Sequence, residues 1–205
     1  MRSRGAWLWL AWALCAPPSP ASDAISFGRL GEVRLFHPAR DARDVVLLFS
    51  PAQGWDAAST ALAHRMSGAG ALVGGVDTKH LLAELEKSGE KCVSLPVEGE
   101  NLSHYLQSRA GLRQYLQPSL AGIGAGASLA YATLVAAPAD LFKGALSVEF
   151  CPQLELKKPL CKGQGLLSAP RRDRAASGRQ QRQPPVSALP RRLLPDCRTC
   201  PAAET

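Results

Sequence analysis

A glycine-rich turn constrains this chain more than any other feature of its sequence. Residues 122–128 read Gly-Ile-Gly-Ala-Gly-Ala-Ser. An apolar run over residues 118–123 leads into the turn, and an alanine-rich run over residues 127–137 follows it. Because glycine adopts backbone conformations that other residues cannot, we expect a strand, a tight turn and a helix in direct succession.

This succession is typical of the nucleophile elbow of α/β-hydrolases, where the pattern G-x-S-x-G exposes a serine hydroxyl on a strained turn. The outer glycines of that pattern are present as Gly122 and Gly126, but the position of the nucleophile is Gly124. Glycine has no side chain that can attack a carbonyl group. The sequence therefore predicts a hydrolase scaffold without its nucleophile.

No other residue is expected to supply the missing chemistry. Ser128 lies one helical turn beyond Gly124, where a hydroxyl commonly bonds back to a carbonyl oxygen, so we regard it only as a minor pocket candidate. The base of such hydrolases follows the nucleophile in the chain, whereas the last histidine here is His104. The glycine spacing also differs from the dinucleotide pattern G-x-G-x-x-G. We predict no catalytic residue, no cofactor and no metal.

The body of the chain, residues 26–161, alternates between strand-like and helix-like segments. Apolar residues make up 46% of the sequence, enough for a globular core. Alternating strands and helices predict a mostly parallel sheet with helices on both faces, and hence an α/β-hydrolase-like three-layer α/β sandwich. The pattern fades after Phe150, so we expect the sheet to be incomplete at the C-terminus. The expected strands are 32–37, 44–50, 71–77, 119–123 and 142–150, and the expected helices 56–67, 79–87, 102–112 and 127–137.

The loop after the second expected strand is a candidate for part of an oxyanion-type pocket. Hydrolases of this class place a backbone donor there, and the pocket candidates in this loop are Ser50, Gln53, Gly54 and Trp55. Gly54 allows a close backbone approach, and Trp55 is placed to cap the pocket. The alternative is a plain turn with a half-buried tryptophan.

Two more pairs of residues complete the candidate pocket. Gly124 and Ala125 contribute the backbone of the glycine-rich turn itself. Asp77 and His80 follow the end of the third expected strand and are minor candidates. Asp77 suits the N-cap of the next helix better than the role of a general base, and His80 suits a solvated loop.

The first 22 residues read as a cleaved secretory signal. Residues 1–4 carry two arginines, residues 6–16 are apolar, and residues 17–22 combine prolines with small side chains. A membrane-spanning helix needs about 20 apolar residues, so the apolar run over residues 6–16 fits a membrane anchor less well than a cleaved signal. We expect an exported chain that is not transmembrane after cleavage.

Export makes the cysteines of the body, Cys92, Cys151 and Cys161, candidates for a disulfide. A Cys151–Cys161 bond would close a short loop and contribute about 3 kcal/mol in the loop-entropy account. Pairing of Cys92 with either of the other two remains open.

The net charge of +7 is concentrated in the tail. Residues 1–161 hold 15 Lys and Arg against 14 Asp and Glu, whereas residues 162–205 hold 9 against 3. The tail is rich in arginine and proline and has no periodic apolar face, so it does not read as a packed core. It is either a disordered basic arm for anionic lipid or nucleic acid, or a stretch translated out of frame. For the nearly neutral folded body we expect no nucleic acid partner.

Several segments resemble the bacterial virulence proteins of the VirJ/AcvB family, and most closely the N-terminal, VirJ-like half of the AcvB-type chains. The resemblance covers about residues 26–165. It is carried by residues 45–50 with Gly54 and Trp55, residues 71–80, residues 121–129 and residues 144–152.

The resemblance implies a periplasmic α/β-hydrolase fold. For complete members it implies hydrolysis of lysyl-phosphatidylglycerol or assistance to type IV secretion. With Gly124 at the elbow, we expect a non-catalytic accessory or binding role at the membrane face, in a truncated or frameshifted family member. The expected partner is a phospholipid head group or a periplasmic protein. The alternative is a serine hydrolase acting on lysyl-phosphatidylglycerol.

Overall fold

The computed structural model describes residues 23–151, 154 and 156–161. The expected signal segment, residues 1–22, and the basic tail, residues 162–205, lie outside the described residues.

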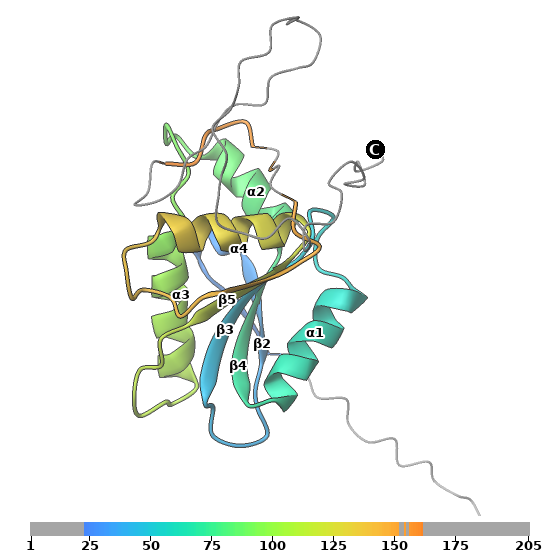
Figure 1. The fold of residues 1–205 in the computed structure, drawn as a ribbon, viewed down its shortest axis with the longest axis vertical. Helices are drawn as coiled ribbons and strands as arrows, with labels where there is room; N and C mark the ends of the chain where they lie inside the picture. The colour runs from blue at the N-terminus through green and yellow to red at the C-terminus, as the bar shows by residue number, and fades with distance from the viewer. Residues whose placement is uncertain (1–22, 152–153, 155, 162–205) are drawn as a thin grey trace, which may run out of the picture.

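A single six-stranded sheet forms the centre of the described chain (Figure 1). The middle of the sheet and one edge are parallel, and the two N-terminal strands run antiparallel at the other edge. In spatial order the strands are β1 (Asp23–Ser26), β2 (Glu32–Phe36), β4 (Ala71–Val76), β3 (Asp44–Phe49), β5 (Ser119–Ile123) and β6 (Ala145–Val148).

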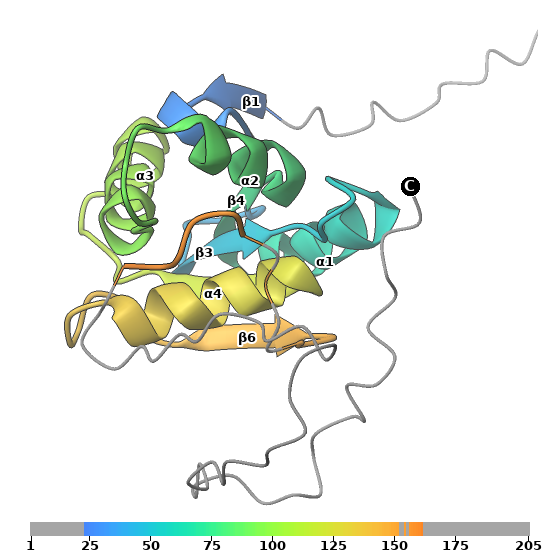
Figure 2. The same ribbon diagram turned by 90° about the horizontal axis from the view of Figure 1, so that it is seen from above.

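Helices cover both faces of this sheet, and Figure 2 shows α1 and α3 on opposite sides of it. Helix α1 (Ala57–Gly68) packs on β4, β3 and β2. The other face carries the short helix η1 (Gly28–Leu30), α2 (Thr78–Lys87), α3 (Pro96–Arg109) and α4 (Ala125–Ala136). The fold is therefore an α/β-hydrolase-like three-layer sandwich with a mostly parallel sheet, which confirms the fold class expected from the sequence.

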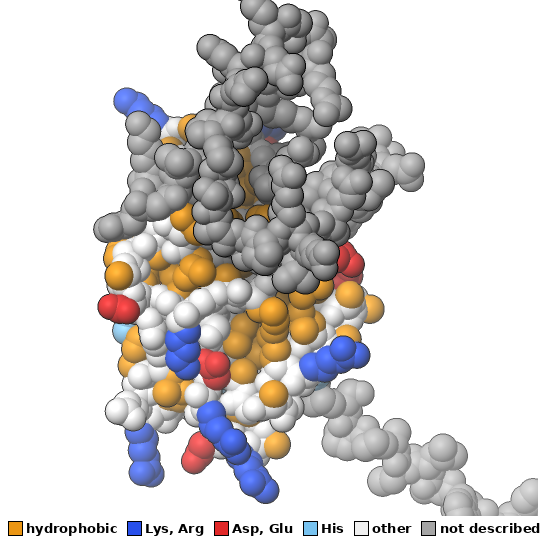
Figure 3. All heavy atoms as spheres, viewed as in Figure 1, with side chains coloured by type: hydrophobic (Ala, Val, Ile, Leu, Met, Phe, Trp, Pro, Cys, Tyr) orange, Lys and Arg blue, Asp and Glu red, His pale blue; other side chains and the backbone are white. Residues whose placement is uncertain are grey.

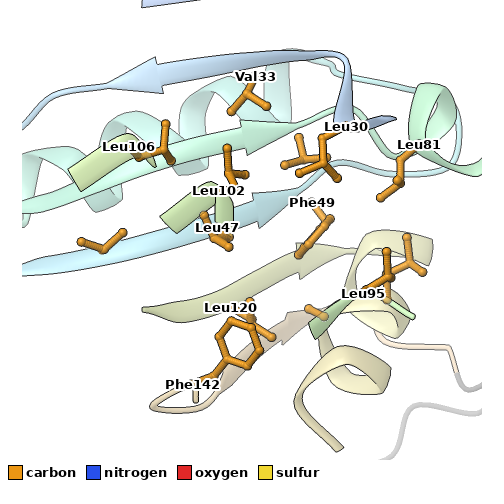
Figure 4. Packing of buried hydrophobic residues seen from close by; sticks show 14 of the residues in the cluster. Leu30, Val33, Leu47, Phe49, Leu81, Leu95, Leu102, Leu106, Leu120 and Phe142 are labelled. Atoms are coloured by element: carbon orange, nitrogen blue, oxygen red, sulfur yellow. The ribbon is translucent and has the colours of Figure 1, made fainter. Parts of the chain in front are cut away.

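Two hydrophobic clusters, one on each face, hold the layers together. Along β3 the side chains alternate: Val45, Leu47 and Phe49 join the larger cluster, whereas Val46 and Leu48 join the smaller one beside α1. Figure 4 shows the larger cluster, in which leucines of α2 and α3 meet the sheet. The run of apolar residues in β3 is explained by this burial on both faces.

Two elements have bounds that differ by several residues from the sequence-based expectation, and one strand was not expected. Helix α3 begins at Pro96 and ends at Arg109, rather than spanning 102–112, because proline suits the first helical position. The last described strand, β6, is confined to four residues, and Glu149 leaves the extended region with a φ of 54°. Strand β1 was not expected, and it pairs with β2 over four residues.

A disulfide joins Cys92 to Cys161, with their Cα atoms 4.9 Å apart. The sequence left this pairing open as an alternative. The predicted disulfide between Cys151 and Cys161, which would close a short loop, is wrong. The physical reason is the path of the chain, which returns to the segment between α2 and α3. There Val93 N donates to Pro159 O at 2.9 Å, and Cys161 N donates to Val93 O at 2.8 Å.

Candidate functional site

The glycine-rich turn joins β5 to α4 through one residue, Gly124. Its φ of 56° and ψ of −118° reverse the chain between the strand and the helix. Gly124 N donates to Val148 O at 2.9 Å, and the Gly124 carbonyl accepts from Ala127 N at 3.1 Å and Ser128 N at 3.2 Å. The turn is thereby tied both to the edge strand β6 and to the first turn of α4.

Steric contacts explain why the three glycines are not equivalent. A Cβ atom on Gly122 would lie 2.2 Å from the backbone of Gly126, and one on Gly126 would lie 2.3 Å from Ser50 O. At Gly124 a Cβ atom would meet no atom within 4 Å among the described residues, its two chain neighbours apart. The outer positions therefore exclude any side chain, whereas the middle position has open space on the side where a nucleophile would stand.

The loop after β3 lies directly against this turn, since Gly126 approaches Ser50 O so closely. Ser50 is fully buried; its Oγ accepts from Thr78 N at 3.0 Å and donates to Pro51 O at 3.3 Å. Gly54 adopts a φ of 109°, and its amide donates to Pro51 O at 3.1 Å. Gln53 between them is exposed. The structure thus brings Ser50 against the glycine-rich turn at the carboxyl ends of β3 and β5.

Trp55 packs on the sheet rather than over the turn. Its ring lies across Gly75 in β4, where a Cβ atom would come within 2.2 Å of it, and stacks on Phe36 at 5.9 Å between centroids. The indole Nε1 donates to Thr60 Oγ1 at 2.9 Å, and the Arg34 guanidinium lies 5.3 Å from the ring centroid. The ring is therefore used in packing between α1 and the sheet.

Asp77 links the loop to helix α2. One carboxylate oxygen accepts from His80 N at 3.1 Å and so caps the helix, while the other accepts from Trp55 N at 3.2 Å. The imidazole of His80 is exposed and lies against Gly31, at the start of β2. Of these two minor candidates, Asp77 holds the loop through its hydrogen bond from the Trp55 amide. The His80 side chain is directed toward η1 and the start of β2.

Ser128 and Ala125 occupy the first turn of α4. The hydroxyl of Ser128 donates to Gly124 O at 3.4 Å and also contacts Cys151 O. Ala125 is half-buried at the first helical position, where backbone amides have no partner inside the helix. The turn therefore offers amide donors and open space, while the Ser128 hydroxyl is bonded to carbonyl oxygens.

The interactions of the histidines lie elsewhere in the described part of the chain. His37 faces Asp23 at 3.8 Å, His64 packs on the Phe36 ring, and His104 stacks on Tyr115 with centroids 4.2 Å apart. Among the residues that the structure describes, no group of three or more His, Cys, Asp or Glu side chains could hold a metal ion. No helix in the described ranges is both long and apolar enough to cross a bilayer.

Thr78 is the site residue that the sequence reasoning missed. It is fully buried directly after Asp77, and its amide fixes the Ser50 hydroxyl. Its own Oγ1 is buried without a hydrogen-bond partner among the described residues. The sequence around Thr78 does not indicate that it holds the Ser50 hydroxyl, because this hydrogen bond joins two segments that are 28 residues apart.

The strand order and the glycine turn together define an α/β-hydrolase-like fold. No model of a known protein family matches the chain, and no curated protein matches it. Among solved structures, one that is similar is Thermogutta terrifontis esterase 2 phosphonylated by sarin, with a TM-score of 0.44 and 16% sequence identity. The match covers 64% of this chain, and the chain spans 55% of the length of that esterase chain.

Proposed function

We propose that this chain is a non-catalytic binding domain built on an α/β-hydrolase-like fold. The observation that carries this proposal is the elbow at Gly124, which has the strand-turn-helix geometry and the open space for a nucleophile but no side chain. Acyl transfer through a covalent intermediate needs a hydroxyl or thiol beside a base. A glycine supplies neither, so the turn retains its shape and its amides while losing the reaction.

The surroundings of the turn support the same proposal. Ser128 is the hydroxyl closest in sequence, and it is bonded to the Gly124 carbonyl and to Cys151 O. The described histidines are engaged away from the turn, with His80 against Gly31 and His104 against Tyr115. No base therefore stands ready to activate a hydroxyl at this point among the described residues.

The ligand proposed for the turn is a polar head group that carries a phosphate. Amides at the start of α4 and the neighbouring loop after β3 favour negatively charged oxygen atoms, because the first turn of a helix has unpaired N–H groups and a positive partial charge. In keeping with the resemblance to VirJ/AcvB proteins, we propose lysyl-phosphatidylglycerol at the periplasmic face, or a periplasmic protein, as the partner. The Cys92–Cys161 disulfide supports an oxidising compartment.

Vesicles containing lysyl-phosphatidylglycerol test binding and hydrolysis in one experiment. The purified chain is expected to sediment with these vesicles and to release no lysine from them. A chain that stays in the supernatant would contradict the proposed binding. A Ser128→Ala variant serves as the control because it removes the one hydroxyl of α4's first turn. Lysine release that this substitution abolishes would establish the alternative, a serine hydrolase acting on that lipid.

A further inference from the structure

Cys151 is held beside the glycine-rich turn. It lies three residues after the end of β6 and is half-buried. Its carbonyl oxygen accepts a hydrogen bond from the hydroxyl of Ser128, in the first turn of α4. The ring of Phe150, directly before it, packs edge to face on Tyr131 of α4, with centroids 5.3 Å apart. The backbone at Cys151 is therefore fixed against α4.

Cys151 also takes part in a disulfide bond. The other two cysteines that the structure describes, Cys92 and Cys161, are bonded to each other. Because a cysteine sulfur atom forms one disulfide, the partner of Cys151 lies outside the described residues. The sequence offers three candidates there, which are Cys15, Cys197 and Cys200.

Cys15 belongs to the expected signal segment. It lies in the apolar run over residues 6–16, ahead of the small residues where cleavage is expected, so export removes it from the chain. Cys197 and Cys200 lie in the tail with the spacing C-x-x-C. Five cysteines then remain, an odd number, so two disulfides leave one thiol over. A bond between Cys197 and Cys200 themselves would leave Cys151 without a partner in this chain.

The tail is long enough to return to Cys151. Cys197 follows Cys161 by 36 residues. A flexible chain of that length has a root-mean-square end-to-end distance of about 30–36 Å. A domain of about 130 residues has a radius of gyration of about 14 Å, so the tail spans a distance comparable to the diameter of the folded body.

We propose that Cys151 forms a disulfide with one cysteine of the Cys197–Cys200 pair, which fastens the tail beside the glycine-rich turn. The two S–H bonds break and one Sγ–Sγ bond forms. Two electrons and two protons pass to a protein disulfide of the oxidising compartment, which becomes a dithiol. Arg198 adjoins Cys197, and a neighbouring guanidinium favours the thiolate, the form that attacks.

Charge by itself gives the tail no fixed place on the body. On the described part of the face seen in Figure 3, basic and acidic side chains are interspersed, and no acidic region is gathered opposite the arginines of the tail. The tail also lacks a periodic apolar face that could pack on the body. A covalent bond is therefore what holds it at Cys151. This attachment favours a basic arm that belongs to the protein over a stretch translated out of frame.

Tryptic mapping without reduction tests the proposal, because trypsin cleaves after Arg198, between the two cysteines of the tail. The full chain is exported into an oxidising compartment and alkylated in acid before digestion. Peptide 144–157 then carries Cys151, peptide 193–198 carries Cys197, and peptide 199–205 carries Cys200. We expect peptide 144–157 to be linked to one of the two tail peptides, while the other tail peptide carries the alkyl group.

Paired serine substitutions distinguish the two disulfides. Cys197→Ser/Cys200→Ser is expected to leave Cys151 alkylated in every chain and the Cys92–Cys161 bond intact. Cys92→Ser/Cys161→Ser is the matched control and is expected to keep the bond between Cys151 and the tail. Mapping of the parent chain gives an answer whether or not either variant folds. No lipid enters this experiment, so its outcome is separate from that of the vesicle assay.

Three results in the parent chain would overturn the proposal. One is a Cys151 that carries the alkyl group, and another is peptide 193–198 linked to peptide 199–205. The third is peptide 144–157 linked to a second copy of itself, which would establish a covalent dimer instead.

Discussion

Gly124 combines an unfavourable backbone conformation with a sterically open position. Its φ of 56° and ψ of −118° lie where side-chain-bearing residues rarely occur, yet within the described residues no atom beyond its chain neighbours lies within 4 Å of the Cβ position. Gly122 and Gly126 differ, because backbone atoms occupy the space that a side chain would need. The turn therefore departs from the G-x-S-x-G pattern at its middle position alone, while its outer positions have the steric requirement for glycine.

Substitutions at these glycines separate strain from steric exclusion. Gly124→Ser is expected to lower the free energy of unfolding by about 1–3 kcal/mol, the cost of a sparsely populated conformation. Gly126→Ala is expected to cost more, because its Cβ would lie 2.3 Å from Ser50 O and force β3 and α4 apart. Urea unfolding of both variants measures the difference. Equal losses would contradict the assignment of open space to Gly124 alone.

Burial raises the pKa of the Glu98 carboxyl group in helix α3. It is ion-paired with Arg29 Nε, and Arg29 also donates to Glu90 at 2.8 and 3.1 Å. Desolvation raises the pKa of Glu98, the charge of Arg29 opposes this, and the charge of Glu90 adds to it. Because the folded-state pKa lies above the unfolded value, this group favours the folded state at low pH and loses that contribution as pH rises through the folded pKa.

Glu98→Gln is therefore expected to leave the chain at least as stable as the parent at neutral pH. The amide removes the buried charge and keeps an oxygen atom beside Arg29 Nε, and the variant loses the decline in stability that the parent shows with rising pH. Unfolding in urea between about pH 4 and pH 8 gives both curves. A variant that is less stable at neutral pH and converges with the parent in acid would contradict the raised pKa.

At the scale of elements, the ends of helices follow local sequence signals where side chains cap them. Asp56 caps α1 by accepting from Ser59 N and Ser59 Oγ, both at 2.7 Å. These bonds were not needed to expect the helix, but they fix its start. Helix α3 lacks a side-chain cap at Leu95, and its first turn holds Pro96 and Gly99 with no apolar period. Its start was therefore placed six residues too late.

Asp56→Ala is expected to lower the free energy of unfolding by about 1 kcal/mol, as loss of an N-cap does. The hydrogen bond from the Ser59 side chain is the first cause that holds the pKa of Asp56 below its ordinary value. The stabilisation is therefore present above the unfolded-state pKa and lost as pH falls through the folded one. Asp41→Ala in an exposed loop is the control. A loss that persists unchanged in acid would refute the capping role.

At the scale of the whole molecule, the parallel part of the sheet was predictable from the sequence. The contacts between segments that are distant in the sequence were not. Residues 44–50 and 71–77 read as buried strands because their apolar runs reflect burial on both faces, and both are strands within one residue. The pairing of Cys92 with Cys161 depends on where the chain returns after β6, which no local pattern encodes. For the same reason the sequence could not place Trp55 on Gly75, or Thr78 on Ser50.

The Cys92–Cys161 disulfide joins the segment before α3 to the segment after β6. The loop that it closes contains α3, β5, α4 and β6. Its cysteines are 69 residues apart, and a loop of that length corresponds to about 4 kcal/mol in the loop-entropy account. A Cys92→Ala/Cys161→Ala variant is expected to lose up to about this much stability in urea. Hydrogen exchange should rise first at Val93 and Cys161, whose amides bond across the return. An unchanged unfolding midpoint would show that this closure contributes nothing.

The central claim is that the elbow is built without a nucleophile, and covalent labelling tests it most directly. The purified full chain is incubated with a serine-reactive fluorophosphonate, and its intact mass is measured beside the Ser128→Ala variant. The mass of both proteins is expected to stay unchanged, because Gly124 has no hydroxyl and Ser128 Oγ is bonded to carbonyl oxygens. One phosphonyl group added to the parent and absent from the variant would contradict it and identify Ser128 as the nucleophile.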